Sequence, residues 1–207
     1  IKAIERTKDM GISIVDLHLS DEYLIGDKKV KLKKALERTG IKVATVFCVH
    51  PGEEIDDLST IEEKIGFRNP NFREERIKRT FLLSDFAQYI GGDKVGAHIG
   101  FIPKDPNEKV YSGLIDAARR IADYCRSNNQ VFSLETGLEK SKTLLRFIQD
   151  VGRDNVKVNF DPANLIICGQ EDPIKALEVL DHYLVGVHCK DGKWPANGSM
   201  FGQECPL

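Results

Sequence analysis

The sequence alternates between short apolar runs and longer charged stretches with helical periodicity, and this alternation limits the folds that the chain can adopt. The apolar runs are rich in Val, Ile and Phe, and they lie at 12–17, 41–49, 94–102, 131–134, 156–160 and 184–187. Runs that are apolar almost throughout are typical of parallel strands covered on both faces. Strands that alternate with helices at this spacing predict βα units around a parallel sheet.

The stretches between the apolar runs carry the signals of amphipathic helices. Apolar residues share one helical face at 110–125, and the same is true of 141–151. Asp172-Pro173 supplies an N-cap and a first helical position for a helix at about 174–183. Glycines stand where several helices are expected to end, at Gly40, Gly91-Gly92 and Gly152.

These elements predict an α/β protein built on a parallel sheet, which is either a closed barrel or an open doubly wound sheet. No glycine-rich phosphate loop such as GxGxxG or GxxxxGK follows an apolar run, which disfavours the dinucleotide-binding and P-loop versions. A complete (β/α)8 TIM barrel has eight strands and about 250 residues. The chain has 207 residues. We predict one partial TIM-barrel domain over 1–207 that lacks the first strand and the last strand–helix unit.

The absence of two strands would leave two unpaired sheet edges. We therefore expect a gap between 12–17 and 184–189, poor solubility, or closure by another chain, as in a homo-oligomer. The long polar segment 50–71 interrupts the third unit, and its length and composition fit a lid or an entrance loop.

Charge and cysteine content argue against several classes of function. The chain has 30 basic and 32 acidic residues and a formal net charge of −2, which gives no attraction to nucleic acid or anionic lipid. Basic runs such as Lys28-Lys29 and 73–79 are interpreted as solvated helix faces. No apolar run approaches the roughly 18 residues of a membrane span, and the first residues do not resemble a signal peptide. Five cysteines without a CxxC pair predict reduced thiols in a cytoplasmic protein.

Each of the six predicted strands ends on a polar side chain that can bind a metal or a substrate. These residues are His18, His50, His98, Glu135, Asp161 and His188. The remaining histidine, His182, falls in a helix and is expected at the surface. A single His or Asp at such a position is more often a hydrogen-bonded packing residue or a helix cap. However, barrel strands end on one face, where active sites are built, so the repeated pattern predicts one shared cup.

Two carboxylates and one imidazole at such a cup suit a divalent cation of intermediate hardness. Mn²⁺, Mg²⁺ or Co²⁺ is favoured ahead of Zn²⁺ for this donor set. Cys189 follows His188 directly, and neighbouring residues of a strand point in opposite directions, so its thiol is expected to point away from the cup.

Four strings in the sequence resemble the xylose-isomerase-like sugar phosphate isomerases and epimerases. Phe-Ser-Leu-Glu-Thr-Gly, Val-Asn-Phe-Asp-Pro-Ala-Asn-Leu and Val-His-Cys-Lys-Asp-Gly resemble the fifth, sixth and seventh strands of that family. Ala97-His98-Ile99-Gly100 resembles the fourth strand. The resemblance covers nearly the whole chain, and the strings Asp-Pro-Ala-Asn and His-Cys-Lys-Asp are fairly specific together and weak alone.

The resemblance implies a metal site and a reaction. The family's metal-binding Glu, Asp and His correspond to Glu135, Asp161 and His188, whereas its strand-eight Glu has no counterpart, because Glu204 is interpreted as a loop residue. The implied reaction is proton abstraction next to a carbonyl through a metal-stabilised enediolate, with Glu135 as the base. For Lys190, a salt bridge to Asp191 or to a neighbouring strand end is an equally good interpretation. The candidate substrate-binding residues are His98, Lys190, His50, His18 and Asn164.

The expected substrate is a small sugar, sugar phosphate or polyol, and other functions stay open. A metal-dependent hydrolase or apurinic endonuclease would need a multi-zinc site and a basic surface. Near-neutral charge counts against it, as does Asn164, which stands where those nucleases carry a further His. A non-catalytic barrel would fit the missing strand-eight Glu. A dehydratase or an aldolase can use the same enediolate.

Overall fold

The computed structural model describes residues 1–53, 61–196, 199 and 201–207, and its main feature is a sheet of six parallel strands. The strands pair in sequence order, from β1 to β6, and each matches one of the six apolar runs. This sequential parallel order confirms a barrel-type topology over an open sheet with a reversal of strand order. The strands are β1 (Ile14–His18), β2 (Lys42–Cys48), β3 (Lys94–Ala97), β4 (Val131–Glu135), β5 (Val156–Phe160) and β6 (Leu184–Val187).

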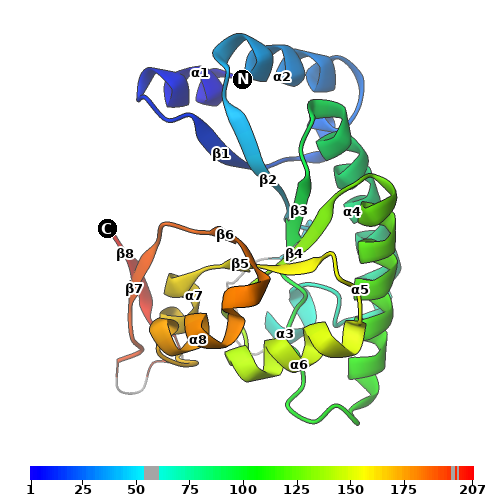
Figure 1. The fold of residues 1–207 in the computed structure, drawn as a ribbon, viewed down its shortest axis with the longest axis vertical. Helices are drawn as coiled ribbons and strands as arrows, with labels where there is room; N and C mark the ends of the chain where they lie inside the picture. The colour runs from blue at the N-terminus through cyan, green and yellow to red at the C-terminus, as the bar shows by residue number, and fades with distance from the viewer. Residues whose placement is uncertain (54–60, 197–198, 200) are drawn as a thin grey trace.

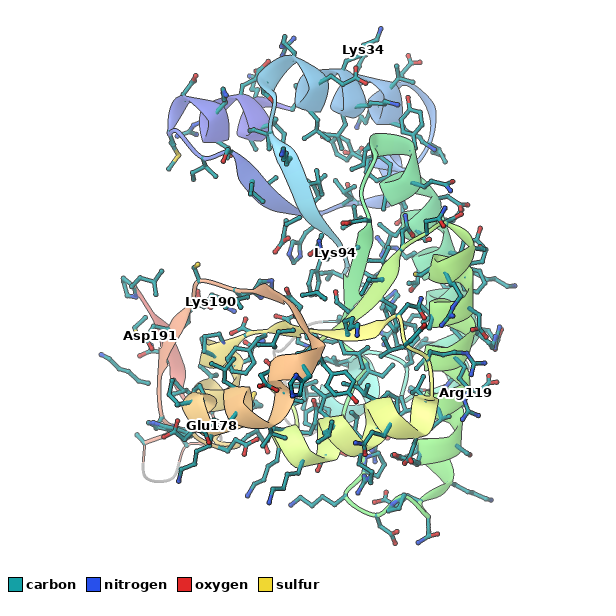
Figure 2. The ribbon with its side chains drawn as sticks, in the orientation of Figure 1. Lys34, Lys94, Arg119, Glu178, Lys190 and Asp191 are labelled. Carbon is teal, nitrogen blue, oxygen red and sulfur yellow. The ribbon has the colours of Figure 1, made fainter. Side chains whose placement is uncertain are left out.

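Helices follow the strands and cover the outside of the curled sheet, which forms a half-barrel (Figure 1). The charged side chains of Lys34, Arg119 and Glu178 point outward from these helices (Figure 2). The helices are α1 (Lys2–Asp9), η1 (Asp21–Tyr23), α2 (Gly26–Thr39), α3 (Ile61–Lys64), α4 (Pro70–Ile90), α5 (Lys109–Ser127), α6 (Ser141–Val151), α7 (Pro162–Ile167), α8 (Pro173–Leu180) and η2 (Asp181–Tyr183).

Local sequence determines where several helices begin and end. Helices α2, α4 and α6 stop at Gly40, Gly91 and Gly152, which adopt left-handed φ angles of 69°, 82° and 62°. Glycine accepts this conformation without the penalty of a Cβ atom. The side chain of Asp172 accepts a hydrogen bond from the N–H of Ile174 and caps α8. The predicted helix ends at these positions are therefore confirmed.

The hydrophobic core lies between the sheet and the helices. Phe132 and Leu134 of β4 and Leu114 and Ile121 of α5 are fully buried. Burial of one such side chain contributes about 1.5–3 kcal/mol relative to exposure. Since successive residues of β4 are buried on both faces, the strand sits in the covered position that its apolar run predicts.

The two edges of the sheet remain apart. In the described part of the chain, β1 and β6 lie at opposite ends of the strand order and are not hydrogen-bonded to each other, which confirms the expected gap. Poor solubility and closure by another chain stay predictions. His182 is exposed on η2, as expected.

Two short strands near the C-terminal end correct the sequence-based expectation. Strands β7 (Asp191–Lys193) and β8 (Gln203–Cys205) pair in an antiparallel manner, so Glu204 lies in a strand and not in a loop. Their three-residue length and their largely exposed side chains explain why no apolar run marks them.

The interpretation of 73–79 as a solvated helix face is wrong for two arginines. Arg76 and Arg79 of α4 are 5% and 9% exposed. Arg79 donates hydrogen bonds to Asp21 and to the carbonyl oxygens of Leu19 and Val49. Carbonyl groups just beyond the strand ends have no partner in the sheet, and a guanidinium group supplies several donors at once. Lys28 is exposed, as predicted.

The predicted lid at 50–71 lies partly outside the described residues, at 54–60. On the described sides of that segment, the carboxylate of Glu53 accepts hydrogen bonds from the N–H groups of His50 and Gly66, each at 2.6 Å. No helix in the described part of the chain combines the length and the apolar character of a transmembrane span. All five cysteines lie in this part, and their thiols are free.

Candidate metal site

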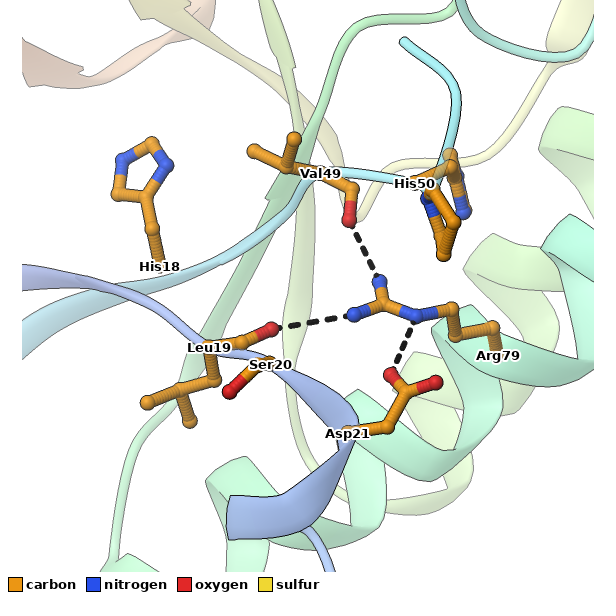
Figure 3. A pocket seen from close by; sticks show the side chains of 8 residues that line it. His18, Leu19, Ser20, Asp21, Val49, His50 and Arg79 are labelled. Atoms are coloured by element: carbon orange, nitrogen blue, oxygen red, sulfur yellow. Dashed lines mark hydrogen bonds and ion pairs between the residues drawn. The ribbon is translucent and has the colours of Figure 1, made fainter.

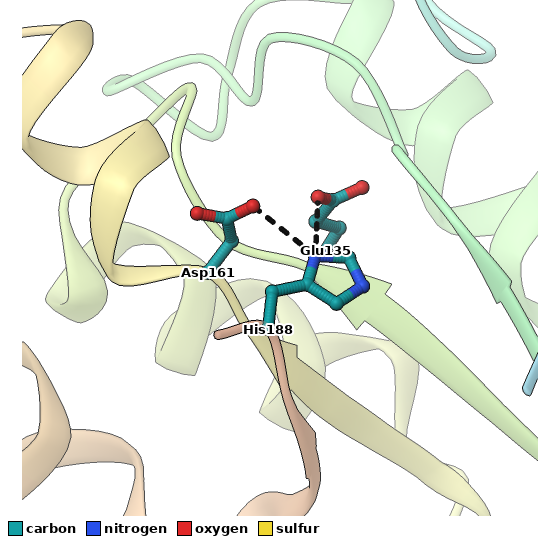
Figure 4. A group of neighbouring side chains, drawn as sticks. All are labelled: Glu135, Asp161 and His188. Carbon is teal, nitrogen blue, oxygen red and sulfur yellow. Dashed lines mark hydrogen bonds and ion pairs between the residues drawn. The ribbon is translucent and has the colours of Figure 1, made fainter. Parts of the chain in front are cut away.

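Three side chains meet at the C-terminal ends of β4, β5 and β6. Glu135 is the last residue of β4, whereas Asp161 and His188 follow β5 and β6 directly. Nδ1 of His188 lies 3.1 Å from Oδ2 of Asp161 and 3.1 Å from Oε1 of Glu135 (Figure 4). The structure thus brings together the three residues that the sequence analysis named as metal ligands, with all three donor atoms within 4.8 Å of one another.

The segment after each strand holds these side chains in place. Thr136 Oγ1 accepts a hydrogen bond from the N–H of Asp161 at 2.7 Å and donates one to its carbonyl oxygen at 3.1 Å. Asp161 caps α7, because its Oδ1 accepts the N–H of Asn164 at 2.9 Å. Gly137 has a φ of 140°, and a Cβ atom there would collide with Asn164. The Thr-Gly pair therefore allows the β4 loop to pack closely on the start of α7.

Both carboxylates are buried, and neighbouring imidazoles balance their charge. Asp161 is 0% exposed and Glu135 is 8% exposed. A buried carboxylate is strongly destabilising unless it is paired and hydrogen-bonded. Burial opposes ionisation of Glu135, but the charges of His98 and His188, and the hydrogen bonds from both, lower its pKa well below the usual range. Hydrogen bonds with Asp16, Asp161 and Glu135 raise the pKa of His188 to about 11.

The donor set fits a divalent cation. Oxygen and nitrogen ligands held at about 2.0–2.3 Å from one ion lie about 3 Å or more from each other. The two 3.1 Å separations around Nδ1 of His188 agree with this geometry. A cation at this position would take the place of the His188 Nδ1 proton as the positive charge between the two carboxylates. Three protein ligands also leave coordination positions open for a substrate.

Three of the predicted substrate-binding residues surround these ligands. Nε2 of His98 lies 2.9 Å from Oε2 of Glu135, and Asn164 donates from Nδ2 to Oε1 of Glu135 at 3.1 Å. Burial opposes protonation of His98, but the charge and hydrogen bond of Glu135 raise its pKa overall. Lys190 Nζ lies 3.1 Å from Asp161 Oδ2, so it pairs with a strand-end residue, one of the two interpretations given above. These side chains place donor groups around the three ligands.

The other two predicted residues, His18 and His50, line a neighbouring cavity of about 590 Å³ (Figure 3). The ring of His18 stacks on Phe47 with centroids 5.1 Å apart, and Phe47 lies 5.5 Å from the ring of His188. His50 is buried, and burial, together with the charges of Arg76 and Arg79, lowers its pKa to about 3. The ring of Phe47 therefore lies between His18, which lines the cavity, and His188 of the cluster, and the cavity presents His50 as a neutral side chain.

Sequence reasoning missed two residues that contact this cluster, Asp16 and Asn159, and it placed a third nearby residue, Glu204, in a loop away from the site. Oδ2 of Asp16 lies 3.3 Å from Nε2 of His188, and the side-chain amide of Asn159 lies 2.9 Å from the same nitrogen. Glu204 of β8 lies 3.3 Å from Lys190. One signal was present, because Asp16 is the only charged residue in the run 12–17. A charge inside an apolar strand usually needs a specific partner.

Comparisons with known proteins identify similar folds. A family model described as a xylose isomerase-like TIM barrel matches residues 2–207. A xylose isomerase domain protein from Planctomyces limnophilus is 32% identical, with a TM-score of 0.93, and the match covers 99% of this chain and 75% of that one. No curated protein matches in sequence.

More distant solved structures share the fold at lower identity. A xylose isomerase-like TIM barrel protein from Mycobacterium smegmatis, solved with magnesium, is 16% identical with a TM-score of 0.70, over 100% of this chain and 71% of that one. D-psicose 3-epimerase from Clostridium cellulolyticum H10, solved with D-tagatose, is 17% identical with a TM-score of 0.68. The match covers 88% of this chain and 64% of that one. Other epimerases and a probable dehydratase also have similar folds.

Proposed function

The chain belongs to the xylose isomerase-like TIM barrel family, and from that premise we propose that it is a divalent-metal-dependent sugar isomerase or epimerase. The observation that carries the proposal is the meeting of Glu135, Asp161 and His188 at the ends of three adjacent strands. The similar folds support this class of reaction, since they include several sugar epimerases. The proposed substrate is a small sugar, sugar phosphate or polyol.

The residues present define the proposed metal site. Glu135 Oε1, Asp161 Oδ2 and His188 Nδ1 are the atoms that would hold the cation. When bound, Mn²⁺, Mg²⁺ or Co²⁺ would act as a Lewis acid that polarises the substrate carbonyl and so favours the enediolate. A protein of similar fold was solved in complex with magnesium, which supports the choice of a divalent cation.

Glu135 is the proposed base for proton abstraction from the carbon next to the carbonyl. The charges and hydrogen bonds of His98 and His188 lower the pKa of Glu135, so the side chain is ionised at neutral pH, the form that can accept a proton. His98 and Asn164 contact its two oxygens and hold the carboxylate in one orientation. His98, Asn164 and Lys190 also carry N–H groups, which we assign to the substrate's hydroxyl and carbonyl oxygens.

The cavity lined by His18 and His50 is the proposed site for the part of the substrate that does not react. Its volume of about 590 Å³ lies within the roughly 300–1,000 Å³ range of small-molecule pockets. Neutral imidazoles can both donate and accept hydrogen bonds, and this suits hydroxyl groups.

The test is exchange of solvent deuterium into ketopentoses and ketohexoses in the presence of Mn²⁺. Glu135→Gln keeps the size of the side chain and one ligand oxygen but removes the base, so exchange should fall by about 10²–10⁴-fold. Glu178→Gln changes an exposed glutamate of α8 (Figure 2) and should leave exchange unchanged. Exchange at the wild-type rate in Glu135→Gln would remove Glu135 from the mechanism.

Analysis of the products formed in the same assay separates the alternatives. Loss of water from the substrate would point to a dehydratase, for which a similar fold exists. The nuclease alternative has less support, because in the described part of the chain only one group of side chains can hold a metal, and Asn164 is hydrogen-bonded to Glu135 there. A non-catalytic barrel would exchange no deuterium with any sugar.

A further inference from the structure

The two ring nitrogens of His188 face different groups. Nδ1 faces Glu135 and Asp161, the side on which the proposed cation would bind. Nε2 faces the carboxylate of Asp16 at 3.3 Å and the amide of Asn159 at 2.9 Å. Asp16 belongs to β1 and His188 follows β6, so this contact joins the two strands that lie at opposite ends of the sheet. The three-residue cluster therefore has a further acidic neighbour, Asp16, from a distant strand.

Irregular backbone pairing accompanies both neighbours of Nε2. In the β1–β2 pair, the register shifts between Val15 and Asp16. In the β5–β6 pair, it shifts between Val158 and Asn159. Bulges of this kind redirect a side chain and are frequent beside active sites. Here each one occurs at the residue whose side chain reaches His188.

Folding stability does not explain why a carboxylate occurs at position 16. The Oδ1 atom of Asp16 is buried and has no hydrogen-bond partner among the residues that the structure describes. A carboxylate oxygen that is removed from water without a partner destabilises the folded state, and such groups often have a functional role. Among the described residues, Asp16 forms an ion pair with His188 alone, and the aliphatic residues around it in β1 show that the strand itself does not require a charge.

We propose that Asp16 is a positioning residue for the metal site. It accepts the Nε2–H of His188, and this leaves the lone pair of Nδ1 directed between Glu135 and Asp161. This inference rests on the metal site of the proposed function. Metal-binding histidines generally donate their second ring N–H to a carboxylate or carbonyl oxygen, which fixes the tautomer and the ring orientation.

Asn159 explains why this choice of tautomer needs a carboxylate. The Nδ2–H of Asn159 donates to Nε2 only when Nε2 carries no proton, and the proton of a neutral ring is then on Nδ1. That tautomer has no lone pair for a cation at Nδ1. A charge-assisted hydrogen bond to Asp16 is stronger than a neutral one to an amide, so Asp16 favours the form that can bind metal.

The experiment is calorimetric titration of the whole chain with Mn²⁺, in wild type and three variants. Asp16→Ala should weaken Mn²⁺ affinity by about 10–100-fold. Asp16→Asn should lose less, because the amide oxygen can still accept the Nε2–H. Asp181→Asn is the matched control, since Asp181 lies 3.6 Å from the exposed imidazole of His182, and it should bind Mn²⁺ as wild type does.

A second measurement separates positioning from general stability. Nitrogen NMR of histidine-labelled, Mg²⁺-loaded protein should show a shifted Nε2 resonance for His188 in Asp16→Asn and an unchanged one in Asp181→Asn. Wild-type Mn²⁺ affinity in the Asp16 variants would overturn this inference and leave the proposed metal site intact. A wild-type chain that binds no Mn²⁺ would overturn both. If Asp16→Ala does not fold, Asp16→Asn decides the outcome alone.

Discussion

His98 Nε2 lies 2.9 Å from Oε2 of Glu135, so the proposed base is paired with an imidazole from the neighbouring strand. The pair links the end of β3 to the end of β4, and Glu135 is almost fully buried. A buried carboxylate that loses one of its partners destabilises the protein, and His188 and Asn164 compensate only in part.

Replacement of His98 should therefore lower the free energy of unfolding. We expect His98→Ala to lose roughly 1–3 kcal/mol, because a buried acceptor is left without its donor. His98→Gln retains an N–H donor and should recover part of the loss. Urea denaturation at neutral pH measures both values. Equal stability of His98→Ala and wild type would show that the pair makes no net contribution.

Asp161 combines two roles, as a proposed ligand and as the cap of α7. Asp161→Ala should abolish measurable Mn²⁺ binding and lower stability by about 1 kcal/mol through loss of the cap. Asp172→Ala is the matched control, because Asp172 caps α8 through Ile174 and lies outside the proposed site. It should show the same loss of stability and unchanged Mn²⁺ binding. Retention of Mn²⁺ affinity in Asp161→Ala would contradict the proposed site.

His50 should make the protein sensitive to acid. Burial, followed by the charges of Arg76 and Arg79, lowers its folded-state pKa to about 3 from an ordinary value of 6.5. The unfolded chain therefore binds a proton that the folded chain does not, and stability falls as the pH drops from about 6.5 toward 3. The slope from this residue is at most about 1.4 kcal/mol per pH unit.

Urea midpoints between pH 7 and pH 4 test the contribution of His50. His50→Asn should flatten this part of the stability profile, because the substituted side chain does not titrate. His182→Asn changes an exposed histidine of η2 and should retain the wild-type slope. An unchanged slope in His50→Asn would mean that other groups cause the acid sensitivity.

Gly137 should tolerate no side chain. A Cβ atom at this position would collide with Asn164, and the φ of 140° is itself unfavourable for other residues. Gly137→Ala should therefore lower stability by about 1–3 kcal/mol or more and weaken Mn²⁺ binding, because α7 carries Asn164 against Glu135. At Gly152, the nearest atom to an added Cβ would be the carbonyl oxygen of Gln149, at 3.8 Å. Gly152→Ala should therefore lower stability by only about 1 kcal/mol, the cost of its left-handed φ, and leave Mn²⁺ affinity unchanged.

The six strands and the main helix ends were determined by the sequence alone. Apolar runs, glycine at a helix end and Asp-Pro at a helix start act over a few residues, so their effects can be predicted without tertiary contacts. The meeting of Glu135, Asp161 and His188 was also predictable, because parallel strands in sequential order end on one side of a sheet.

Only the tertiary structure decided how these ligands are supported. Arg79 is buried because the carbonyl groups of Leu19 and Val49, distant in sequence, need donors where α4 packs against the strand ends. Asp16 reaches His188 because the sheet curls and the β1–β2 register shifts at that residue. Glu204 faces Lys190 because β8 pairs with β7. Curvature, register and packing of distant segments are non-local properties, and no short pattern in the sequence encodes them.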